Sequence, residues 1–259
     1  MFALTPVVRA LLIVNVLVFL VTNEAVIERY GLHSFLSDRF NPVQLFTHMF
    51  LHGGFNHILS NMIGLLVFGP MLERFWGAKR FTFFYFFCGI GAALLFSGIN
   101  YFEIRDVYEA VRDYRASPTP EGFIAFVDTQ AQSFYDRVAS FIEQFERQPT
   151  NPQFVEGSLR IVNRLYLQQV DQPMVGASGA IFGVIMGFGL LFPNTQLFLL
   201  FPPIPIKAKY LVIGYAAIEL YSGLYQAQSD NVAHFAHIGG MLFAFILVKY
   251  WGSQRKTFY

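Results

Sequence analysis

Three polar clusters interrupt apolar stretches of this sequence, where each polar side chain is costly and therefore needs a reason. They comprise residues 45–62, Gly176–Ala180 and His234–Gly240. A serine becomes a nucleophile when a base takes its proton, and histidine has a pKa suited to taking and returning it. Ser178 and His237 are therefore the candidate nucleophile and base.

The surroundings of Ser178 suit an anionic intermediate. Ser178 opens an apolar segment of helical length, where free backbone N–H groups and the helix dipole favour negative charge. An oxyanion formed during acyl transfer needs such donors. His57 and Asn61 are four residues apart, so they share one helical face and both can donate towards that oxyanion.

Other polar residues keep alternative roles open. A Gly-x-Ser-Gly sequence alone more often serves helix packing, and His234 competes with His237 for the role of base. His48 and His52 suit structural hydrogen bonding, with a metal site as the alternative, although no carboxylate or cysteine stands at suitable spacing. Glu219 lies within an apolar span, where a structural or water-facing role competes with participation in catalysis.

Composition places the chain in a membrane. Of its 259 residues, 54% are hydrophobic and only 14% are charged, against roughly 25% in soluble domains. The net charge of +1 does not favour nucleic-acid binding. The single cysteine, Cys88, excludes an intrachain disulfide framework and a multi-cysteine metal site. We expect no cofactor and no metal, and the lipid bilayer as the surrounding phase.

Six apolar segments approach the roughly 20 residues that a membrane span requires. They are Val7–Thr22, His57–Phe75, Phe81–Phe102, Ser178–Phe192, Tyr210–Tyr225 and His234–Trp251. No convincing small-x-small cleavage site follows the first segment, so we interpret it as a span rather than a signal peptide. The sequence predicts an all-α membrane protein with six transmembrane helices.

The region between the third and fourth spans has a different character. Residues 101–173 hold most of the acidic residues, and apolar residues recur there at helical spacing. Thr119-Pro120-Glu121 provides a helix start. We predict an α-helical extramembrane insertion of two or three amphipathic helices, between core parts 1–100 and 174–259. It packs on itself or at the membrane surface, or it forms a module that binds substrates or partners.

The lysines orient the spans. With six spans, all five lysines share one side with the N-terminus, at Lys79, Lys207, Lys209, Lys249 and Lys256. The positive-inside rule makes that side cytoplasmic. Spans two, four and six then run inward, which places their polar N-terminal ends in one layer near the outer side. Small-residue stripes, Gly179/Gly183/Gly187 and Ala236/Gly240/Ala244, let the fourth and sixth spans approach closely.

These motifs resemble those of the rhomboid proteases across almost the whole chain except the insertion. The family's Gly-x-Ser-Gly, Ala-His-x-x-Gly and His-x-x-x-Asn motifs match at Gly176–Gly179, Ala236–Gly240 and His57/Asn61. Its additional histidines match at His48 and His52, and its Glu-Arg and Gly match at Glu73-Arg74 and Gly77.

The resemblance implies a six-helix rhomboid bundle that acts as an intramembrane serine endopeptidase. It implies a Ser178–His237 dyad without an acidic third member, and an oxyanion hole of the Ser178 N–H, His57 and Asn61. Phe182 would stack on the catalytic histidine, with Gly176, Gly179 and Gly240 in support. Substrates would be single- or multi-span membrane proteins, cut near the top of a transmembrane segment at small residues.

Two departures and two alternatives accompany the resemblance. The Trp-Arg pair of many members is Val43-Gln44 here, which puts the anchoring of the first outer loop in doubt. The third loop is much longer than usual.

A non-catalytic rhomboid-like protein that binds transmembrane helices would lack the serine or the histidine, and both are present. A transporter would show an inverted repeat, and we find none. We expect a bacterial cytoplasmic membrane protein with both termini cytoplasmic.

Overall fold

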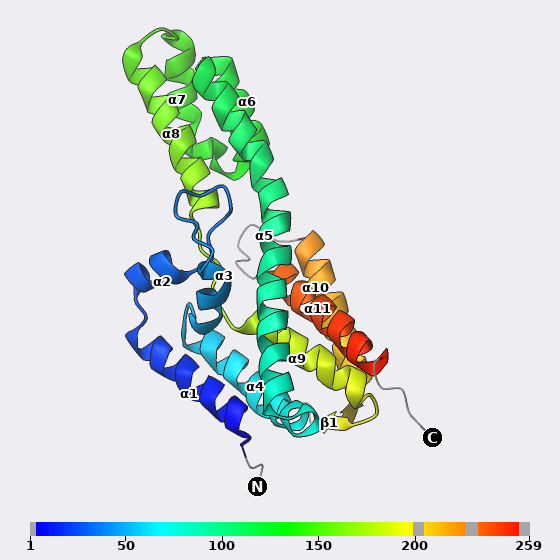
Figure 1. Ribbon diagram of the computed structural model, residues 1–259. Coiled ribbons are helices and arrows are strands. Elements are labelled where there is room, and N and C mark those ends of the chain that lie inside the picture. Colours follow the sequence, from blue (N-terminus) through cyan, green and yellow to red (C-terminus); the bar gives the residue numbers. More distant parts are fainter. Residues whose placement is uncertain (1–3, 199–204, 226–232, 254–259) are drawn as a thin grey trace. The chain divides into compact units, whose positions relative to one another are not determined.

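The computed structural model describes residues 4–198, 205–225 and 233–253, so Lys256 lies outside the described residues. The described chain is dominated by helices (Figure 1), with one antiparallel pair of three-residue strands that the all-α prediction did not include. The α-helices are α1 (Pro6–Val21), α2 (Glu24–Tyr30), α3 (Gln44–Thr47), α4 (Phe55–Trp76), α5 (Ala78–Ala116), α6 (Pro120–Gln130), α7 (Tyr135–Arg147), α8 (Pro152–Val170), α9 (Ser178–Leu191), α10 (Ala208–Leu224) and α11 (His234–Ser253). Two 3₁₀ helices, η1 (His48–Phe50) and η2 (Gln132–Phe134), and strands β1 (Gln196–Phe198) and β2 (Pro205–Lys207) complete it.

The chain divides into two compact units, each with its own hydrophobic core. The first unit comprises the residues up to Leu32, residues 41–98 and the residues from Pro173 onward. The second unit comprises residues 33–40 and 99–172. The three polar clusters all belong to the first unit.

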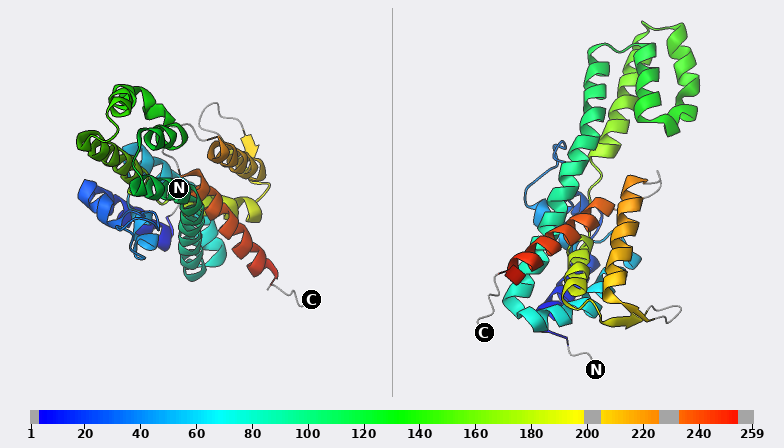
Figure 2. Two further views of the ribbon diagram at one scale, coloured as in Figure 1. Left: turned by 90° about the horizontal axis from the view of Figure 1, so that it is seen from above. Right: turned by 90° about the vertical axis from the view of Figure 1, so that its right-hand side faces the viewer.

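Helix α9 is the central element of the first unit. Helices α4, α10 and α11 pack against it, and the views in Figure 2 show α9 beside α11. Its sequence, SGAIFGVIMGFGLL, is apolar or small on every side, which is typical of a helix buried all round. The element that carries Ser178 is therefore held by neighbouring helices on several sides.

The outer surface of the first unit is apolar. Leu20, Ile213 and Ile246 are exposed over 73%, 64% and 50% of their surface, which suits contact with lipid. Helices α4, α5 and α11 are long and apolar enough to cross a membrane, and α1 and α9 are apolar but shorter. These helices indicate an integral membrane protein, and the six-span plan stays a prediction.

Helix α5 runs past the predicted end of the third span. That span is predicted to end at Phe102, and α5 continues without a break to Ala116. The first compact unit ends at Gly98 within this helix, and the predicted end of the core part at residue 100 stays a prediction. The composition becomes charged there, but no glycine or proline stands between Gly98 and Ser117-Pro118. A change from apolar to polar residues does not itself end a helix, whereas those breakers do.

The second unit consists of helices that pack on each other. Thr119 caps α6 by accepting a hydrogen bond from the Gly122 N–H at 3.1 Å, as its sequence predicts. Phe123, Val127 and Phe145, three of the apolar residues at helical spacing, are fully buried. The unit therefore has a hydrophobic core of its own, and its status as an extramembrane insertion stays a prediction.

A buried carboxylate fixes the start of α1. Glu73, near the end of α4, accepts hydrogen bonds from the Val7 and Val8 N–H groups, both at 2.9 Å. The first N–H groups of a helix have no partner within the helix, and negative charge is favourable there. The Glu-Arg sequence after the second predicted span thus joins α4 to α1.

Candidate active site

Ser178 and His237 meet where α9 and α11 begin. The His237 Nε2 lies 2.9 Å from the Ser178 Oγ, within hydrogen-bond reach for a base and its nucleophile. These residues are 59 positions apart, so the packing of α9 on α11 creates the pair. His237 is 8% exposed, which shields the pair from bulk water.

Phe182 holds the histidine ring from one side. Its ring lies parallel to that of His237, with centroids 4.1 Å apart and planes inclined by 9°. Phe182 stands one helical turn after Ser178, so a single helix carries both the nucleophile and the surface on which the base rests.

Glycines allow α9 and α11 to approach. A Cβ on Gly240 would overlap the carbonyl oxygen of Gly179, and a Cβ on Gly183 would lie 2.6 Å from the Cβ of Cys88. Such overlaps with backbone or a short side chain cannot be relieved by a rotamer change. Gly179 and Gly183 of the predicted stripe lie close to backbone carbonyls of α11, whereas Gly187 lies against Phe84 and Leu72.

The outer loop positions the residues just before Ser178. Leu32 and Met174 exchange two backbone hydrogen bonds, at 2.9 and 2.8 Å. The Gly176 N–H donates to the His48 carbonyl at 2.9 Å. Gly176 itself has a φ of +132°, in a region that side chains with a Cβ rarely adopt. The first cluster thus holds the approach to the nucleophile.

His57 and Ser178 flank the same small space beside Gly176. A Cβ at residue 176 would lie 2.7 Å from the His57 Nε2 and 3.6 Å from the Ser178 Oγ. The His57 Nδ1 accepts from the Gly53 N–H at 3.4 Å, so the neutral ring carries its proton on Nε2. His57 can therefore donate a hydrogen bond into the space next to the nucleophile.

Asn61 takes a less direct position. Its side chain is buried, and Nδ2 donates to the His57 carbonyl at 2.8 Å, one turn back along α4. The amide has two N–H donors, so this bond leaves one for another acceptor. A role for Asn61 in an oxyanion hole stays a prediction.

The sequence left the role of Glu219 open. In the structure, the Glu219 carboxylate lies beside His237. The Glu219 Oε2 lies 2.8 Å from the His237 Nδ1 and 2.7 Å from the His234 Nδ1. The three side chains are all buried, and their polar atoms lie within 4.8 Å of one another, a spacing that could also hold a metal ion. Among the described residues, His237 is the histidine that lies within hydrogen-bond distance of the Ser178 Oγ.

His48 and His52 lie in the buried part of the outer loop. The His48 Nδ1 lies 2.9 Å from the Gln44 carbonyl, which only accepts, so the ring donates there as a structural residue. Burial lowers the pKa of His48 and of His52 to about 4. For His52, the proximity of His57 is the second cause of the lowered pKa, after burial.

We expect the protein to lose stability between pH 6.5 and pH 4. Both histidines are neutral when folded, whereas the unfolded chain takes up protons below its pKa of 6.5. The contribution of the two neutral rings to the free energy of unfolding is therefore complete above pH 6.5. It falls by about 3 kcal/mol per histidine as the pH drops to 4, and it is constant below pH 4. Denaturant unfolding in detergent at pH 7, 5.5 and 4.5 measures it.

The matched variant for this test is His48→Asn, whose amide can still donate to the Gln44 carbonyl. It should lose less stability than the wild type over the same pH interval. An unfolding free energy that does not change between pH 7 and 4.5 in the wild type would contradict the neutral state of the two rings.

Gln44 anchors the outer loop where the Trp-Arg pair is missing. Its Nε2 donates to the Arg29 carbonyl at 3.2 Å, and its Oε1 accepts from the Asn41 N–H at 3.1 Å. The nearby Thr47 hydroxyl donates to the Tyr30 carbonyl at 2.7 Å. Where many family members have a Trp-Arg pair, this chain has Val43-Gln44, and hydrogen bonds of the Gln44 amide to backbone groups anchor the loop.

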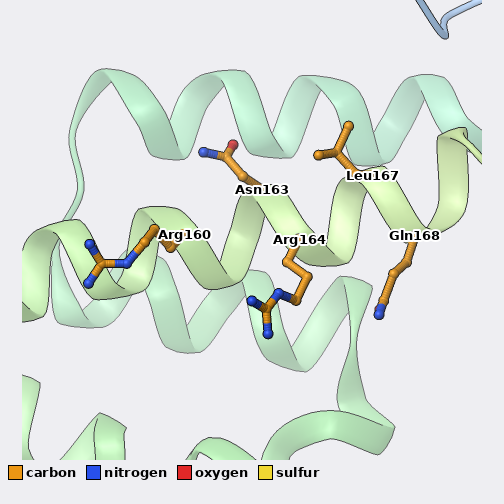
Figure 3. A pocket seen from close by; sticks show the side chains of 5 residues that line it. All are labelled: Arg160, Asn163, Arg164, Leu167 and Gln168. Carbon is orange, nitrogen blue, oxygen red and sulfur yellow. The ribbon is translucent and has the colours of Figure 1, made fainter. Parts of the chain in front are cut away.

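A groove on α8 of the second unit has no residue in common with the three clusters. Its lining residues are Arg160, Asn163, Arg164, Leu167 and Gln168 (Figure 3). Arg160 lies 3.6 Å from Glu156 and Arg115 donates to Asn163, so the polar groups are engaged at the surface. We assign this groove no part in the candidate active site.

Comparison with known families decides the identity of the fold. The model of the Rhomboid domain matches residues 39–103 and 154–254, which include all three polar clusters. The chain belongs to the rhomboid family. The unmatched residues 104–153, between the two matched segments, fall within the second compact unit.

Two curated rhomboid relatives come from Arabidopsis thaliana. The chain is 26% identical over 229 residues to RHOMBOID-like protein 12, mitochondrial, covering 87% of this chain and 50% of that protein. It is 40% identical over 57 residues to RHOMBOID-like protein 1, covering 22% of this chain and 15% of that protein. The chain thus spans half the length of the first relative and a smaller share of the second.

Proposed function

We propose that this rhomboid protein is an intramembrane serine endopeptidase that cleaves membrane proteins in or near their transmembrane segments. The observation that carries the proposal is the 2.9 Å approach of His237 Nε2 to Ser178 Oγ, with the ring stacked on Phe182. Nucleophile and base at hydrogen-bond distance, inside a buried site, suit acyl transfer. A rhomboid-like protein that only binds transmembrane helices would not need this geometry.

The reaction follows from these groups. The Ser178 Oγ attacks the scissile carbonyl carbon while His237 Nε2 takes the hydroxyl proton. The resulting oxyanion accepts hydrogen bonds from the Ser178 N–H and the His57 Nε2–H, with Asn61 as a further donor. The intermediate then expels the amine, which receives the proton from His237, and leaves an acyl-enzyme. Water, deprotonated by His237, releases the acid and restores Ser178.

The substrate class follows from the location of the site. We propose that α1, α4, α5, α9, α10 and α11 form six spans with both termini cytoplasmic, in a bacterial cytoplasmic membrane. The beginnings of α4, α9 and α11 then lie near the outer side, where the end of a substrate's transmembrane segment can reach Ser178. Gly176 lets His57 lie close to the nucleophile, because a Cβ there would be 2.7 Å from the His57 Nε2, and the resemblance to the rhomboid proteases supports cleavage at small residues.

The proposal is tested with the purified full-length protein in detergent or liposomes. Wild-type protein should cut a single-span model substrate, and Ser178→Ala should not. A fluorophosphonate probe should label the wild type and fail to label Ser178→Ala. If wild type cuts no better than Ser178→Ala across several substrates, the protease function is wrong, and persistent labelling of Ser178→Ala would disprove the assignment of the nucleophile.

A further inference from the structure

Glu219 is a buried residue between two exposed neighbours on α10. Ile218 and Leu220 on either side are exposed over 60% and 50% of their surface, whereas Glu219 is 7% exposed. A carboxylate buried in a membrane-spanning helix is costly unless it is paired and hydrogen-bonded. Its partners are the Nδ1 atoms of His237 and His234, at 2.8 and 2.7 Å from the same oxygen, Oε2.

The sharing of Oε2 allows two arrangements of the protons. One carboxyl oxygen can carry at most one hydrogen, so a protonated Oε2 would donate to one ring while it accepts from the other, and the two rings would then be different tautomers. An ionised carboxylate only accepts, and both histidines then carry a proton on Nδ1. His237 in this tautomer has its lone pair on Nε2, the atom that lies 2.9 Å from the Ser178 Oγ. The carboxylate thereby holds the ring in the form that can act as base.

We infer that Glu219 is a positioning residue for His237, so that the machinery is a Ser178–His237–Glu219 triad rather than the dyad that the sequence implies. The inference rests on the proposed protease function. Glu219 fixes the tautomer and orientation of His237 and stabilises the positive charge that the ring acquires when Ser178 attacks. His234, through its own bond to Oε2, keeps the carboxylate turned towards His237.

A metal ion at the same three residues would exclude this role. A divalent ion would bind the Nδ1 lone pairs of both rings, which places the proton of His237 on Nε2. That atom would then donate instead of accepting, and it could not take the Ser178 proton. A metal-bound site therefore predicts that a chelator raises the activity, whereas the triad predicts no effect of a chelator.

The decisive variants are Glu219→Gln, Glu219→Asp and His234→Asn, in the full-length protein. Glu219→Gln has the same shape without the charge, and we expect kcat to fall roughly 10²- to 10⁴-fold with little change in KM. Glu219→Asp keeps the charge and should recover part of the rate. His234→Asn leaves the His237 bond in place and should lose less than Glu219→Gln. EDTA should have no effect on the wild type.

A second measurement separates this inference from the protease function itself. Proton NMR of the ¹⁵N-histidine-labelled protein should show a strongly downfield His237 Nδ1–H signal that is lost in Glu219→Gln. Wild-type kcat in Glu219→Gln, activity that changes with EDTA, or the absence of the downfield signal would each overturn the triad. A wild type that shows the signal but cuts no substrate would support the His237–Glu219 contact and count against protease activity alone.

Discussion

Ser178→Ala, His237→Ala and the variant that combines them are expected to have the same residual activity, roughly 10⁴- to 10⁶-fold below wild type. The two side chains act in one step, because the serine attacks only as the histidine takes its proton. Removing either one removes the whole step, so the second substitution has nothing left to impair. The measurement is the initial rate of cleavage of one model substrate in liposomes.

The control for this series is Ser253→Ala, a serine at the exposed end of α11 whose hydroxyl donates only locally, to the Tyr250 carbonyl at 2.8 Å. It should cleave at the wild-type rate. Probe labelling of Ser178 should also slow in His237→Ala, since the hydroxyl has lost its base. Labelling at the wild-type rate in that variant would show that another group, such as His234, activates the serine.

The sequence predicts the pairing of Ser178 with His237 because the relevant signals are local and strong. Each residue opens an apolar segment of helical length, and in the predicted six-span plan the even-numbered spans all begin on the same side of the membrane. That plan predicts the two residues at one depth, and it predicts that glycines on both helices permit close contact. The structure places their side chains 2.9 Å apart.

Glu219 could not be assigned from the sequence, because its role depends on the rotation of α10 about its axis. The helix has apolar residues on all sides, so no amphipathic pattern indicates which face turns inward. His234 and His237 follow 15 and 18 residues later on another helix. Only the packing of α10 against α9 and α11 brings the carboxylate to the histidines.

The backbone hydrogen bonds that position the outer loop also join residues far apart in the sequence. The Leu32–Met174 bridge and the bond from Gly176 to His48 join segments more than 120 residues apart through backbone atoms. Backbone hydrogen bonds do not depend on residue type, so the sequence does not indicate them.

The extent of α5, by contrast, could be predicted from the sequence. The absence of glycine and proline between Gly98 and Ser117 indicates one helix, and the change in composition concealed it.

Gly240→Ala is expected to abolish cleavage more severely than a single methyl group would suggest. The added Cβ would overlap the Gly179 carbonyl oxygen, a backbone atom that cannot change rotamer, so α11 must move away from α9. That movement draws His237 away from Ser178, and a displacement of about 1 Å can cost roughly 10²-fold in rate. Overpacking of this kind should also lower the unfolding free energy by about 1–3 kcal/mol.

The matched control is Gly214→Ala on α10, where an added Cβ meets no atom within 4 Å. Alanine is a better helix former than glycine, so this variant should keep wild-type activity and equal or higher stability. Gly183→Ala, whose Cβ would lie 3.1 Å from the Gly240 carbonyl oxygen and against Cys88, should fall between the two. Cleavage rate, probe labelling and thermal unfolding of the three variants measure the series. Equal activity in Gly240→Ala and Gly214→Ala would show that the distance between α9 and α11 does not control the catalytic pair, because the helices would then separate without loss of rate.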